Sequence, residues 1–582
     1  MAPAEIPFLG IVSHGKFVPV SERAGITFYP LQQPSIMALV APEDAAPPEV
    51  DIDESGSSFS IREQRAPKYT PSNLIGPSRD MGAKSADWGK HSDGAMVHLS
   101  FEKVMGQASG RWMATFKDTS AIDWGKRDVI DGDWADLVIL RNGVPIPMAR
   151  GVVDSVREQT RSAGGATVRV WNVSGRDHGA FFEYPISWTS FWVQTLGEVS
   201  QGLMTAEVKG KIGGRPDELF ALLIKAGVGP GKIDGQWELP PSLGERVGSA
   251  KRMYDLLRVV PLASSLSAPS KGLRGAYWNE PRLWNEGGQH LHQTLLAWCN
   301  PLLNEIFYDL VPAPQFMPPN GLSGYLISTV EDVDIIDEEE LESLRQADPP
   351  IRGGVSGSIR VETPSPISLT SDDGGFGKLG AYIRERPFPN TIEGSNSLWF
   401  ALPTWRIPDW LIESTDLGWG GAERYNLFEL NAEFGLGATN EHPPQAKPLW
   451  FRDGIKRWGL RPFQQTTPYC AVDGGLGAWF QERDTWQRLL VDWNAPMPWL
   501  RQGTITFKLC LPEIRIGMRL IVTPGGDASR DEQFYVEGVR HEWSYPPGKG
   551  STTVTVTHGF RGTDGQFLEA VKAASALFEK TP

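Results

Sequence analysis

Two pairs of residues carry side chains that could bind a metal ion. His290 and His292 stand two residues apart, a spacing that suits a strand but puts the two imidazoles on different sides of a helix. No third ligand follows nearby, so we interpret this pair as structural. His541-Glu542 resembles the start of the zinc-protease motif HExxH, but Tyr545 stands where the second histidine is needed. The sequence therefore predicts no metal site.

The three cysteines are the candidates for a nucleophile. Catalysis by cysteine needs a thiolate beside a positioned histidine. Cys299 falls on the apolar face of an expected helix, while Cys470 and Cys510 have aromatic or strand-like surroundings. A free cysteine is more often a small buried apolar residue, so we interpret all three as packing residues. Their wide spacing, with no CxxC pair, is typical of a reduced compartment and excludes a dense disulfide framework.

Carboxylates are abundant, because the chain contains 70 Asp and Glu residues, and a glycosidase-like pair can be drawn in many places. Glu331 with Asp337 is one example, but both belong to an acidic run, residues 331–342, that is typical of a solvated surface. The glycine-rich stretches 213–214 and 473–475 lack the Gly-Lys-Ser/Thr ending of a phosphate-binding loop and indicate turns. We therefore predict no catalytic, cofactor-binding or metal-binding residue, no cofactor and no enzymatic activity.

Ten tryptophans lie between Trp399 and Trp499, the densest aromatic region of the chain. Exposed tryptophans could bind a saccharide, but tryptophan is also enriched in cores and at the centres of protein interfaces. The first four are interspersed with strand-like sequence and are not grouped on one short loop: Trp399, Trp405, Trp410 and Trp419. This arrangement favours core or interface positions.

The elements that position these residues are expected to be mostly short strands. The 582 residues suffice for about four domains, and 63 glycines, 46 prolines and 10% aromatic residues favour β-structure with many turns. The formal net charge of -14 argues against a protein that grips nucleic-acid phosphates. No signal peptide and no run of eighteen apolar residues is found, so we expect a soluble cytoplasmic product without a membrane span.

Alternating apolar residues predict strands in two regions. From Met96 onward the first region contains four strand-like stretches: 111–116, 129–140, 148–157 and 167–173. A closed or nearly closed small barrel would leave no exposed edge in this region. The second region contains residues 514–520 and 552–557. Residues 41–71 are rich in Pro, Ala, Asp, Glu and Ser, which indicates an extended arm or linker.

Four helices are expected as inserts between the strands. Each shows apolar residues at intervals of three and four, and they cover residues 216–227, 291–298, the surroundings of 486–493, and 566–580. Residues 261–275 are rich in Ser, Pro and Gly and mark a loop or domain boundary.

Several segments, in chain order, resemble the baseplate hub family of phage tails, which is related to the late control gene D proteins. The first group is a strand carrying Gly132-Asp133, a strand carrying Gly-Val-Val-Asp at 151–154, and a strand ending in Ser-Gly-Arg-Asp at 174–177. The second group is the passage 300–305, with the pattern N-x-x-x-NE, and the stretch 384–388, Arg-Glu-Arg-Pro-Phe.

The remaining groups lie in the C-terminal half. The third group comprises residues 425–430, the helix at Trp486, and residues 511–517, Leu-Pro-Glu-Ile-Arg-Ile-Gly. The fourth is the hairpin-like pair 534–541 and 552–559. The resemblance covers roughly Met96 to Phe182 and Leu291 to Gly559 and leaves the first ninety or so residues unexplained.

The resemblance implies a mainly β fold with α-helical inserts: two tube-like β-barrels per chain plus mixed α/β domains next to the spike. We expect an N-terminal extended arm or linker at 1–90, the first part of barrel 1 at 91–185 and a helix-containing insert at 186–290. A mixed α/β domain with an acidic loop would follow at 291–395, a Trp-rich mixed domain at 396–500, and the strands of barrel 2 with the C-terminal helix at 501–582.

The same resemblance implies a structural role in the virion, at the tail baseplate. Three chains would form a homotrimeric ring that adapts the sixfold tail tube to the threefold central spike, with the tube protein, the spike protein and other baseplate proteins as partners. DNA would pass only transiently through the lumen, for which acidic walls are expected. A tail-associated peptidoglycan hydrolase and a tail-tip carbohydrate-binding protein are the alternatives. The sequence does not distinguish a contractile phage from a non-contractile one or from a bacteriocin-like particle.

Overall fold

The computed structural model describes the larger part of the chain in separate stretches. The main ones are 22–31, 96–117, 127–141, 144–163, 166–183, 239–248, 252–261, 290–299, 301–311, 378–389, 398–420, 424–432, 447–467, 475–545 and 548–580. Short strand pieces lie at 4–5, 10–13, 16–19, 51–52, 59–60 and 84–87, and single residues are described at 122, 124, 220, 224, 250, 316 and 318.

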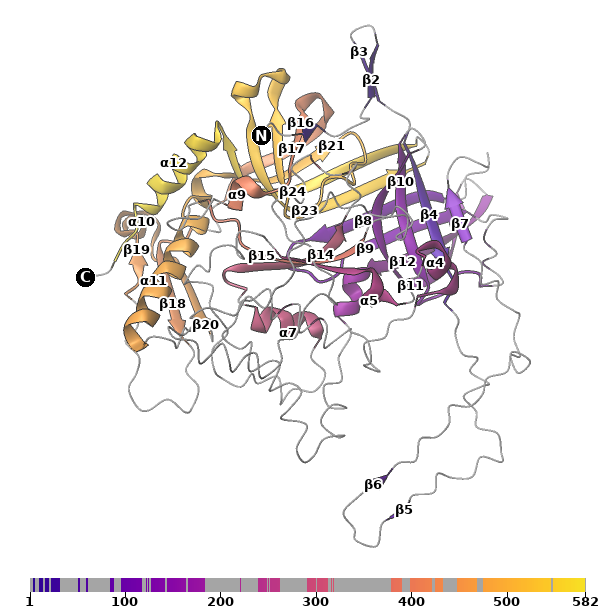
Figure 1. Cartoon of the computed structure of the whole chain (residues 1–582). Coiled ribbons are helices and arrows are strands. Elements are labelled where there is room, and N and C mark those ends of the chain that lie inside the picture. The colour runs from indigo at the N-terminus through magenta and orange to yellow at the C-terminus, as the bar shows by residue number, and fades with distance from the viewer. Residues whose placement is uncertain are drawn as a thin grey trace.

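The fold is mainly β, and its largest element is one curled sheet of 14 strands in which most neighbours are antiparallel (Figure 1). Its first part, here called the first lobe, has the pairing order β8-β9-β12-β11-β10-β4. These strands are β4 (Glu22–Tyr29), β8 (Met96–Val104), β9 (Arg111–Lys117), β10 (Trp134–Arg141), β11 (Val144–Ala163) and β12 (Ala166–Asp177). The short strand β7 (Lys84–Asp87) pairs with the far side of β4.

The other part of the sheet, the second lobe, has the order β16-β22-β23-β24-β21-β17. Its strands are β16 (Thr404–Pro408), β17 (Ile412–Trp419), β21 (Arg501–Phe507), β22 (Arg519–Thr523), β23 (Glu532–Ser544) and β24 (Lys549–Arg561). The outer strands β16 and β17 follow each other in the chain through the short helix η10 (Asp409–Leu411), which brings the two ends of this lobe together. The strand β1 (Ala4–Glu5) pairs with β16.

One long strand joins the lobes. The first residues of β23 pair with β22, while residues 538–544 pair with β8 of the first lobe, and β24 pairs along most of its length. Hydrogen bonds therefore run without interruption from β17 to β4. Since both lobes share β23, they are two halves of one sheet.

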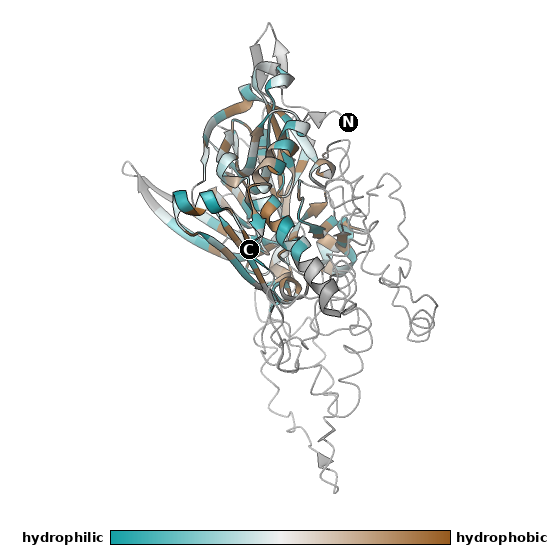
Figure 2. Cartoon of the chain, turned by 90° about the vertical axis from the view of Figure 1, so that its left-hand side faces the viewer, coloured by the Kyte–Doolittle hydropathy of each residue, from teal (hydrophilic) through white to brown (hydrophobic). Residues whose placement is uncertain are grey.

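Alternation explains why these segments are strands. In β9, Trp112, Ala114 and Phe116 are buried while Arg111 and Met113 are exposed, and in β24 the valines are buried. Figure 2 accordingly shows teal and brown residues mixed along the strands. Separate apolar clusters fill the first and the second lobe.

Two smaller sheets flank the large one. The first has the order β13 (Leu257–Pro261), β15 (Lys378–Glu385), β14 (Asn304–Val311) and packs with η3 (His178–Phe182), α4 (Pro241–Arg246), α5 (Met253–Leu256) and α7 (Leu291–Trp298). The second has the order β20 (Pro462–Thr467), β18 (Leu427–Ala432), β19 (Leu449–Trp450), β25 (Glu579–Lys580). Around it lie α9 (Leu398–Ala401), α10 (Arg452–Trp458), α11 (Gly475–Asn494) and α12 (Asp564–Ser575).

Two further strand pairs are described at the N-terminal side, β2 (Gly10–Ser13) with β3 (Lys16–Pro19), and β5 (Asp51–Ile52) with β6 (Phe59–Ser60). Three single-turn helices complete the second half: η11 (Met497–Trp499), η12 (Pro524–Gly526) and η13 (Ala528–Arg530). No helix among the described residues is long and apolar enough to cross a membrane.

Most of the expected elements are confirmed. Three of the four strand-like stretches of the first region lie in β9, β11 and β12, and the fourth, 129–140, is confirmed from Trp134 onward as β10, after a turn at 131–132. Residues 552–557 lie in β24, and the helices at 291–298 and 486–493 are α7 and part of α11. Phe220 and Ile224 are helical and buried, and the rest of the helix expected at 216–227 lies outside the described residues, as do 261–275 and nearly all of 41–71.

Four expectations were wrong in detail. Residues 514–518 are not a strand: β22 begins only at Arg519, because the preceding residues turn inward to bind other elements. The C-terminal helix ends at Ser575, and 579–580 form β25. Residues 22–29, assigned to the N-terminal arm, form β4 of the first lobe, since their apolar residues fill its core. Strands β16 and β17 of the expected Trp-rich domain belong to the second lobe.

Candidate functional site, a buried junction between the lobes

The segment 509–518, called the junction segment, connects β21 to β22 and is buried throughout although it forms neither helix nor strand. Its backbone groups have partners elsewhere: Cys510 N–H donates to Glu22, Leu511 N–H donates to the Thr552 hydroxyl, and Gly517 N–H donates to the Val536 carbonyl. Buried backbone groups must be satisfied, so these bonds fix the path of the segment.

Glu513 of the junction segment binds the first lobe. The Arg141 guanidinium, at the end of β10, donates to Glu513 Oε1 at 2.6 Å and to the Cys510 carbonyl at 2.6 Å. Glu22 Oε1 lies 3.6 Å from Arg141 Nε, and all three charged side chains are almost completely buried. Two carboxylates thus share one guanidinium, and burial, opposed by Arg141, raises the pKa of Glu22 to about 7.

Arg515 binds two further elements. Its guanidinium donates to Asp309 of β14 at 2.6 Å and to the Pro147 carbonyl of β11 at 2.8 Å. Asp309 belongs to the three-stranded sheet and Pro147 to the first lobe, so this single side chain connects three parts of the fold. Charge-assisted hydrogen bonds of this kind are about twice as strong as neutral ones.

Gly517 receives the third connection. Arg384 of β15 donates to the Gly517 carbonyl at 2.8 Å, to Glu305 of β14 at 2.9 Å, and to the Tyr535 hydroxyl at 2.6 Å. Gly517 has φ +75°, and a Cβ placed there would lie 2.6 Å from Arg384 Nη2, so both the backbone conformation and the guanidinium require glycine.

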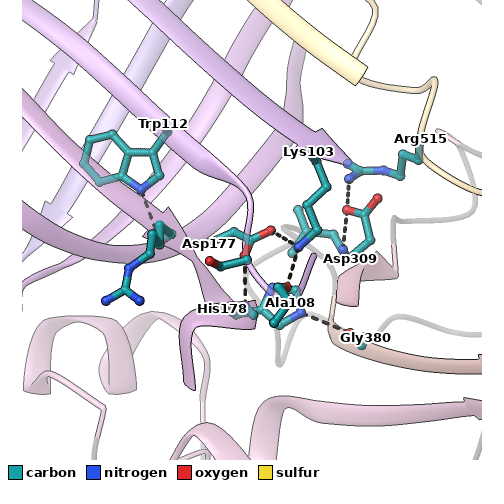
Figure 3. A network of polar contacts seen from close by, with 12 residues as sticks. Lys103, Ala108, Trp112, Asp177, His178, Asp309, Gly380 and Arg515 are labelled. Atoms are coloured by element: carbon teal, nitrogen blue, oxygen red, sulfur yellow. Dashed lines mark hydrogen bonds and ion pairs between the residues drawn. The ribbon is translucent and has the colours of Figure 1, made fainter. Parts of the chain in front are cut away.

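A neighbouring network ties β8 and β12 of the first lobe to the three-stranded sheet (Figure 3). Lys103 donates to Asp177 and, at 3.0 Å, to the Ala108 carbonyl. His178 Nε2 lies 3.0 Å from the Gly380 carbonyl of β15. Burial, together with the nearby Lys103 charge, lowers the pKa of His178 to about 3, so the ring is neutral at pH 7 and donates from Nε2.

Several of the residues that form these contacts belong to the segments that resemble the hub family. Asp177 ends the Ser-Gly-Arg-Asp stretch, Glu305 ends the N-x-x-x-NE passage, Arg384 begins Arg-Glu-Arg-Pro-Phe, and Glu513 and Arg515 belong to Leu-Pro-Glu-Ile-Arg-Ile-Gly. The motifs are far apart in sequence, yet their charged residues meet at the junction segment or beside it. Their side chains form buried ion pairs and charge-assisted hydrogen bonds, which fix the positions of the elements that carry them.

Three other motif residues form contacts elsewhere in the first lobe. Arg176 and Asp154, from the first group of segments, form a bidentate pair at 2.8 and 3.0 Å, and Arg176 also binds Glu183 at 2.8 Å. Asp133 accepts the backbone N–H groups of Leu31 and Ile130 at 2.9 Å each and so stabilises the turn before β10.

The residues considered for chemistry have structural surroundings. His292 is buried with Nδ1 3.1 Å from the Tyr308 hydroxyl, and His290 is the N-cap residue of α7. His541 is buried, and burial lowers its pKa to about 3. Cys299 and Cys510 are buried, and burial raises the pKa of the Cys510 thiol well above its usual range, which opposes a thiolate.

The described residues contain no group of three or more His, Cys, Asp or Glu that could hold a metal ion. Glu331, Asp337, Cys470 and the glycine-rich stretches 213–214 and 473–474 lie outside the described residues. Gly475 is the first residue of α11.

The tryptophans of 399–499 whose side chains are described fall into three groups. Trp399, Trp405, Trp486 and Trp493 are buried, as expected for core residues, and Trp450 and Trp458 are half-buried. Trp410, Trp419 and Trp499 are exposed at 42%, 66% and 48%.

The charged residues of the junction were not predicted as a buried site, although the sequence contains a pattern that indicates them. In β8, Leu99, Phe101 and Lys103 alternate on the inward face, and in β10 Leu137, Ile139 and Arg141 do the same. A charged residue that continues an inward-facing apolar row must find a buried partner. That pattern predicts a buried ion pair, but it does not identify the partner.

Comparisons with known proteins give likenesses of fold. The chain is similar to a tail protein from Neisseria meningitidis MC58 (12% identity, TM-score 0.38, covering 82% of this chain and 95% of that one). It is also similar to a 43 kDa tail protein of prophage MuSo2 from Shewanella oneidensis (11%, TM-score 0.38, 84% and 95%). A third is the c3393 protein of E. coli, a component of the type VI secretion system described as similar to the T4 tail proteins gp27 and gp5 (8%, TM-score 0.32, 81% and 76%).

At these identities and TM-scores the likeness carries no functional argument. No family model matches the chain, and no curated protein matches it.

Proposed function

We propose that this chain is the structural hub of a phage tail baseplate, a homotrimeric ring that adapts the sixfold tail tube to the threefold central spike. The observation that carries the proposal is the convergence of the hub-like motifs. Their charged residues, Glu305, Arg384, Glu513 and Arg515 among them, pair with one another or with the first lobe around one buried segment. These contacts fix how the two lobes are placed within the chain, and an adaptor ring needs lobes in fixed positions.

The shape of the large sheet supports the same role. A sixfold tube offers six equivalent surfaces and a threefold spike offers three, and closed rings need matching interfaces. Two six-stranded lobes per chain would give a trimer six lobes, one for each surface of the tube. The strands within 134–173 and within 519–559 belong to different lobes that adjoin edge to edge through β23 and β8, and two such units per chain are what the proposed adaptor needs. An acidic wall of the axial channel stays a prediction of this proposal.

The test is assembly. The purified chain, mixed with the tube protein and the spike protein of the same particle, should form a ring of three copies with one tube ring and one spike, measured by native mass spectrometry and electron microscopy. A chain that stays monomeric with both proteins present, or that joins the particle away from the tail axis, would overturn the proposal. The Glu513→Gln variant, which weakens the junction, should assemble less well than wild type.

A tail-tip carbohydrate-binding role is the second candidate, and the exposed Trp419 and Trp499 favour it. Trp419 pairs in register with Arg501, two residues after Trp499, so both indoles lie at the same end of β17 and β21. Binding of host surface saccharide to the isolated chain, lost in Trp419→Ala and kept in Trp410→Ala, would establish it. The absence of such binding, with assembly intact, would leave the hub role.

A further inference from the structure

A basic surface surrounds α10, on the side of the molecule opposite the first lobe (Figure 1). Residues 447–461 contain five Lys and Arg residues and one acidic residue, Asp453, in a chain with a net charge of -14. All five cationic side chains are exposed: Lys447, Arg452, Lys456, Arg457 and Arg461. We call this set the basic surface.

Aromatic rings hold part of the basic surface in place. The Arg452 guanidinium lies over the Trp450 ring at 5.0 Å, and Arg457 lies over Trp458 at 5.6 Å. Neither Arg452 nor Arg457 forms an ion pair with a described residue, whereas Lys456 pairs with Asp453 at 3.3 Å. Stacked guanidinium groups keep their N–H edges available for anions.

An apolar residue completes the surface. Leu460, directly after α10, is 60% exposed, the second most exposed of the large apolar side chains in the described residues. Arginines around an exposed leucine suit a partner that carries both carboxylates and aliphatic side chains, and suit a phosphate backbone less well, because phosphates offer no apolar group.

The chain itself contains a segment of this composition. Residues 331–342 contain eight Asp and Glu residues, no Lys or Arg, and the aliphatic residues Ile335, Ile336 and Leu341. Electrostatic attraction between a block of one sign and a surface of the other acts over a Debye length of about 8–10 Å.

The connection is long enough for contact within one chain. Val311 and Lys378 are paired at one end of the β14–β15 hairpin, so the stretch that contains the acidic segment starts and ends there. The 20 residues from Val311 to Glu331 reach up to about 66 Å when extended. The hairpin itself, with strands of 8 residues, is about 27 Å long. Leu303 and Phe388, at its other end, pack in the same apolar cluster as Leu449 and Phe451 beside α10.

We propose that the acidic segment, residues 331–342, docks on the basic surface of the same chain. Its carboxylates pair with Arg452, Lys456 and Arg457, and its aliphatic side chains cover Leu460. The contact is a binding function beyond the hub role and does not depend on it.

The first test uses the segment in trans. A fluorescent peptide of residues 329–344 is titrated into full-length chain whose acidic residues in 331–342 are replaced by Asn and Gln. The peptide should bind, with affinity that falls about tenfold or more from low to high salt, and Arg452→Glu/Arg457→Glu should abolish binding. The matched control, Lys117→Glu/Arg157→Glu on the exposed side of the first lobe, should leave binding unchanged. A peptide with lysines in place of the acids should bind the Arg452→Glu/Arg457→Glu variant.

The second test uses the intact chain. A photo-crosslinker at Leu341 should react with residues 447–461, and in a mixture of isotopically light and heavy chains the crosslinks should join residues of one isotope. Crosslinks between light and heavy chains would assign the contact to a second copy and overturn the proposal as stated. Binding of duplex DNA or of phosphatidylglycerol vesicles to the basic surface, with no binding of the peptide, would also overturn it. As a control for folding, each variant should unfold at the same melting temperature as wild type.

Discussion

The two lobes have the same number of strands but differ in what fills them. The second lobe is filled by its own strands and the junction segment, with residues of the three-stranded sheet such as Phe307 and Tyr382 at its margin. The core of the first lobe contains Trp543 of β23 and Cys510 of the junction segment, both from the second half of the chain. The first lobe thus depends on the second for part of its core, whereas the reverse dependence is slight.

Buried charge shows the same asymmetry. The ends of β8 and β10 in the first lobe carry Lys103 and Arg141. Lys103 pairs with Asp177 of the same lobe, whereas Arg141 pairs both with Glu22 of β4 and with Glu513 of the junction segment. Buried ion pairs contribute little net stability but penalise any arrangement in which one partner is missing. We infer that these pairs fix how the lobes meet more than they stabilise either lobe.

The largest effect is expected from breaking that contact. Arg141→Met leaves both Glu513 and Glu22 buried without their guanidinium, and the free energy of unfolding should fall by about 3–5 kcal/mol, measured by denaturant titration. Arg141→Met with Glu513→Leu and Glu22→Gln should recover most of the loss. Arg540→Ala, which removes an exposed pair with Glu542, should cost under about 1 kcal/mol. Equal losses in both single variants would show that the junction is no more sensitive than the surface.

The second prediction concerns dependence of one lobe on the other. Trp543 is fully buried in the first-lobe core, and its indole donates to the Glu22 carbonyl at 3.3 Å. Trp543→Ala should destabilise the chain by about 3–5 kcal/mol and increase hydrogen exchange first in β9 and β10. Trp405→Ala, the matched change in the second-lobe core, should act first on β21 and β22. Faster exchange of both lobes together in Trp543→Ala would contradict the asymmetry.

Most of the sheet could be predicted from the sequence, because apolar and polar residues alternate along its strands. The junction segment could not be predicted, because its path depends on partners that are distant in sequence. Ile514, Arg515 and Ile516 look like an alternating strand, yet Arg515 is buried against Asp309, which is distant in sequence. Residues 22–29 were assigned to an arm because their pairing partner, β10, lies more than a hundred residues later. Local pattern predicts an element well, and it predicts tertiary partners poorly.

The third prediction uses pH to test the shared guanidinium of the junction. The pKa of Glu22 is raised from 4.5 to about 7 in the folded chain, chiefly by burial. The folded state therefore holds the proton more tightly than the unfolded state, so the stabilisation is complete below pH 4.5 and is lost as pH rises to 7. Between those values wild type should lose on the order of 3 kcal/mol relative to Glu22→Gln. Parallel stability curves of the two proteins from pH 4.5 to 8 would refute the shift.

The smallest effect is expected at the exposed motif pair of the first lobe. Arg176 and Asp154 are partly exposed, with side-chain exposures of 26% and 34%, so water screens their attraction. Arg176→Ala should lower the free energy of unfolding by about 1 kcal/mol or less, measured by denaturant titration, whereas Arg384→Ala, at the buried pair with Glu305, should lower it by about 3–5 kcal/mol.

Arg176 and Arg384 both belong to hub-like motifs. Comparing the two variants therefore distinguishes a motif residue that stabilises the fold from one that contacts another copy of the chain. If Arg176 serves a contact between copies, Arg176→Ala should form fewer rings with the tube and spike proteins although the isolated chain is nearly as stable as wild type. The control is Lys549→Ala, which removes an exposed pair with Glu413 in the second lobe and should leave both properties unchanged. Ring formation by Arg176→Ala at the wild-type level would assign Arg176 to the first lobe alone, and a large loss of stability would show that its pair acts like the buried ones.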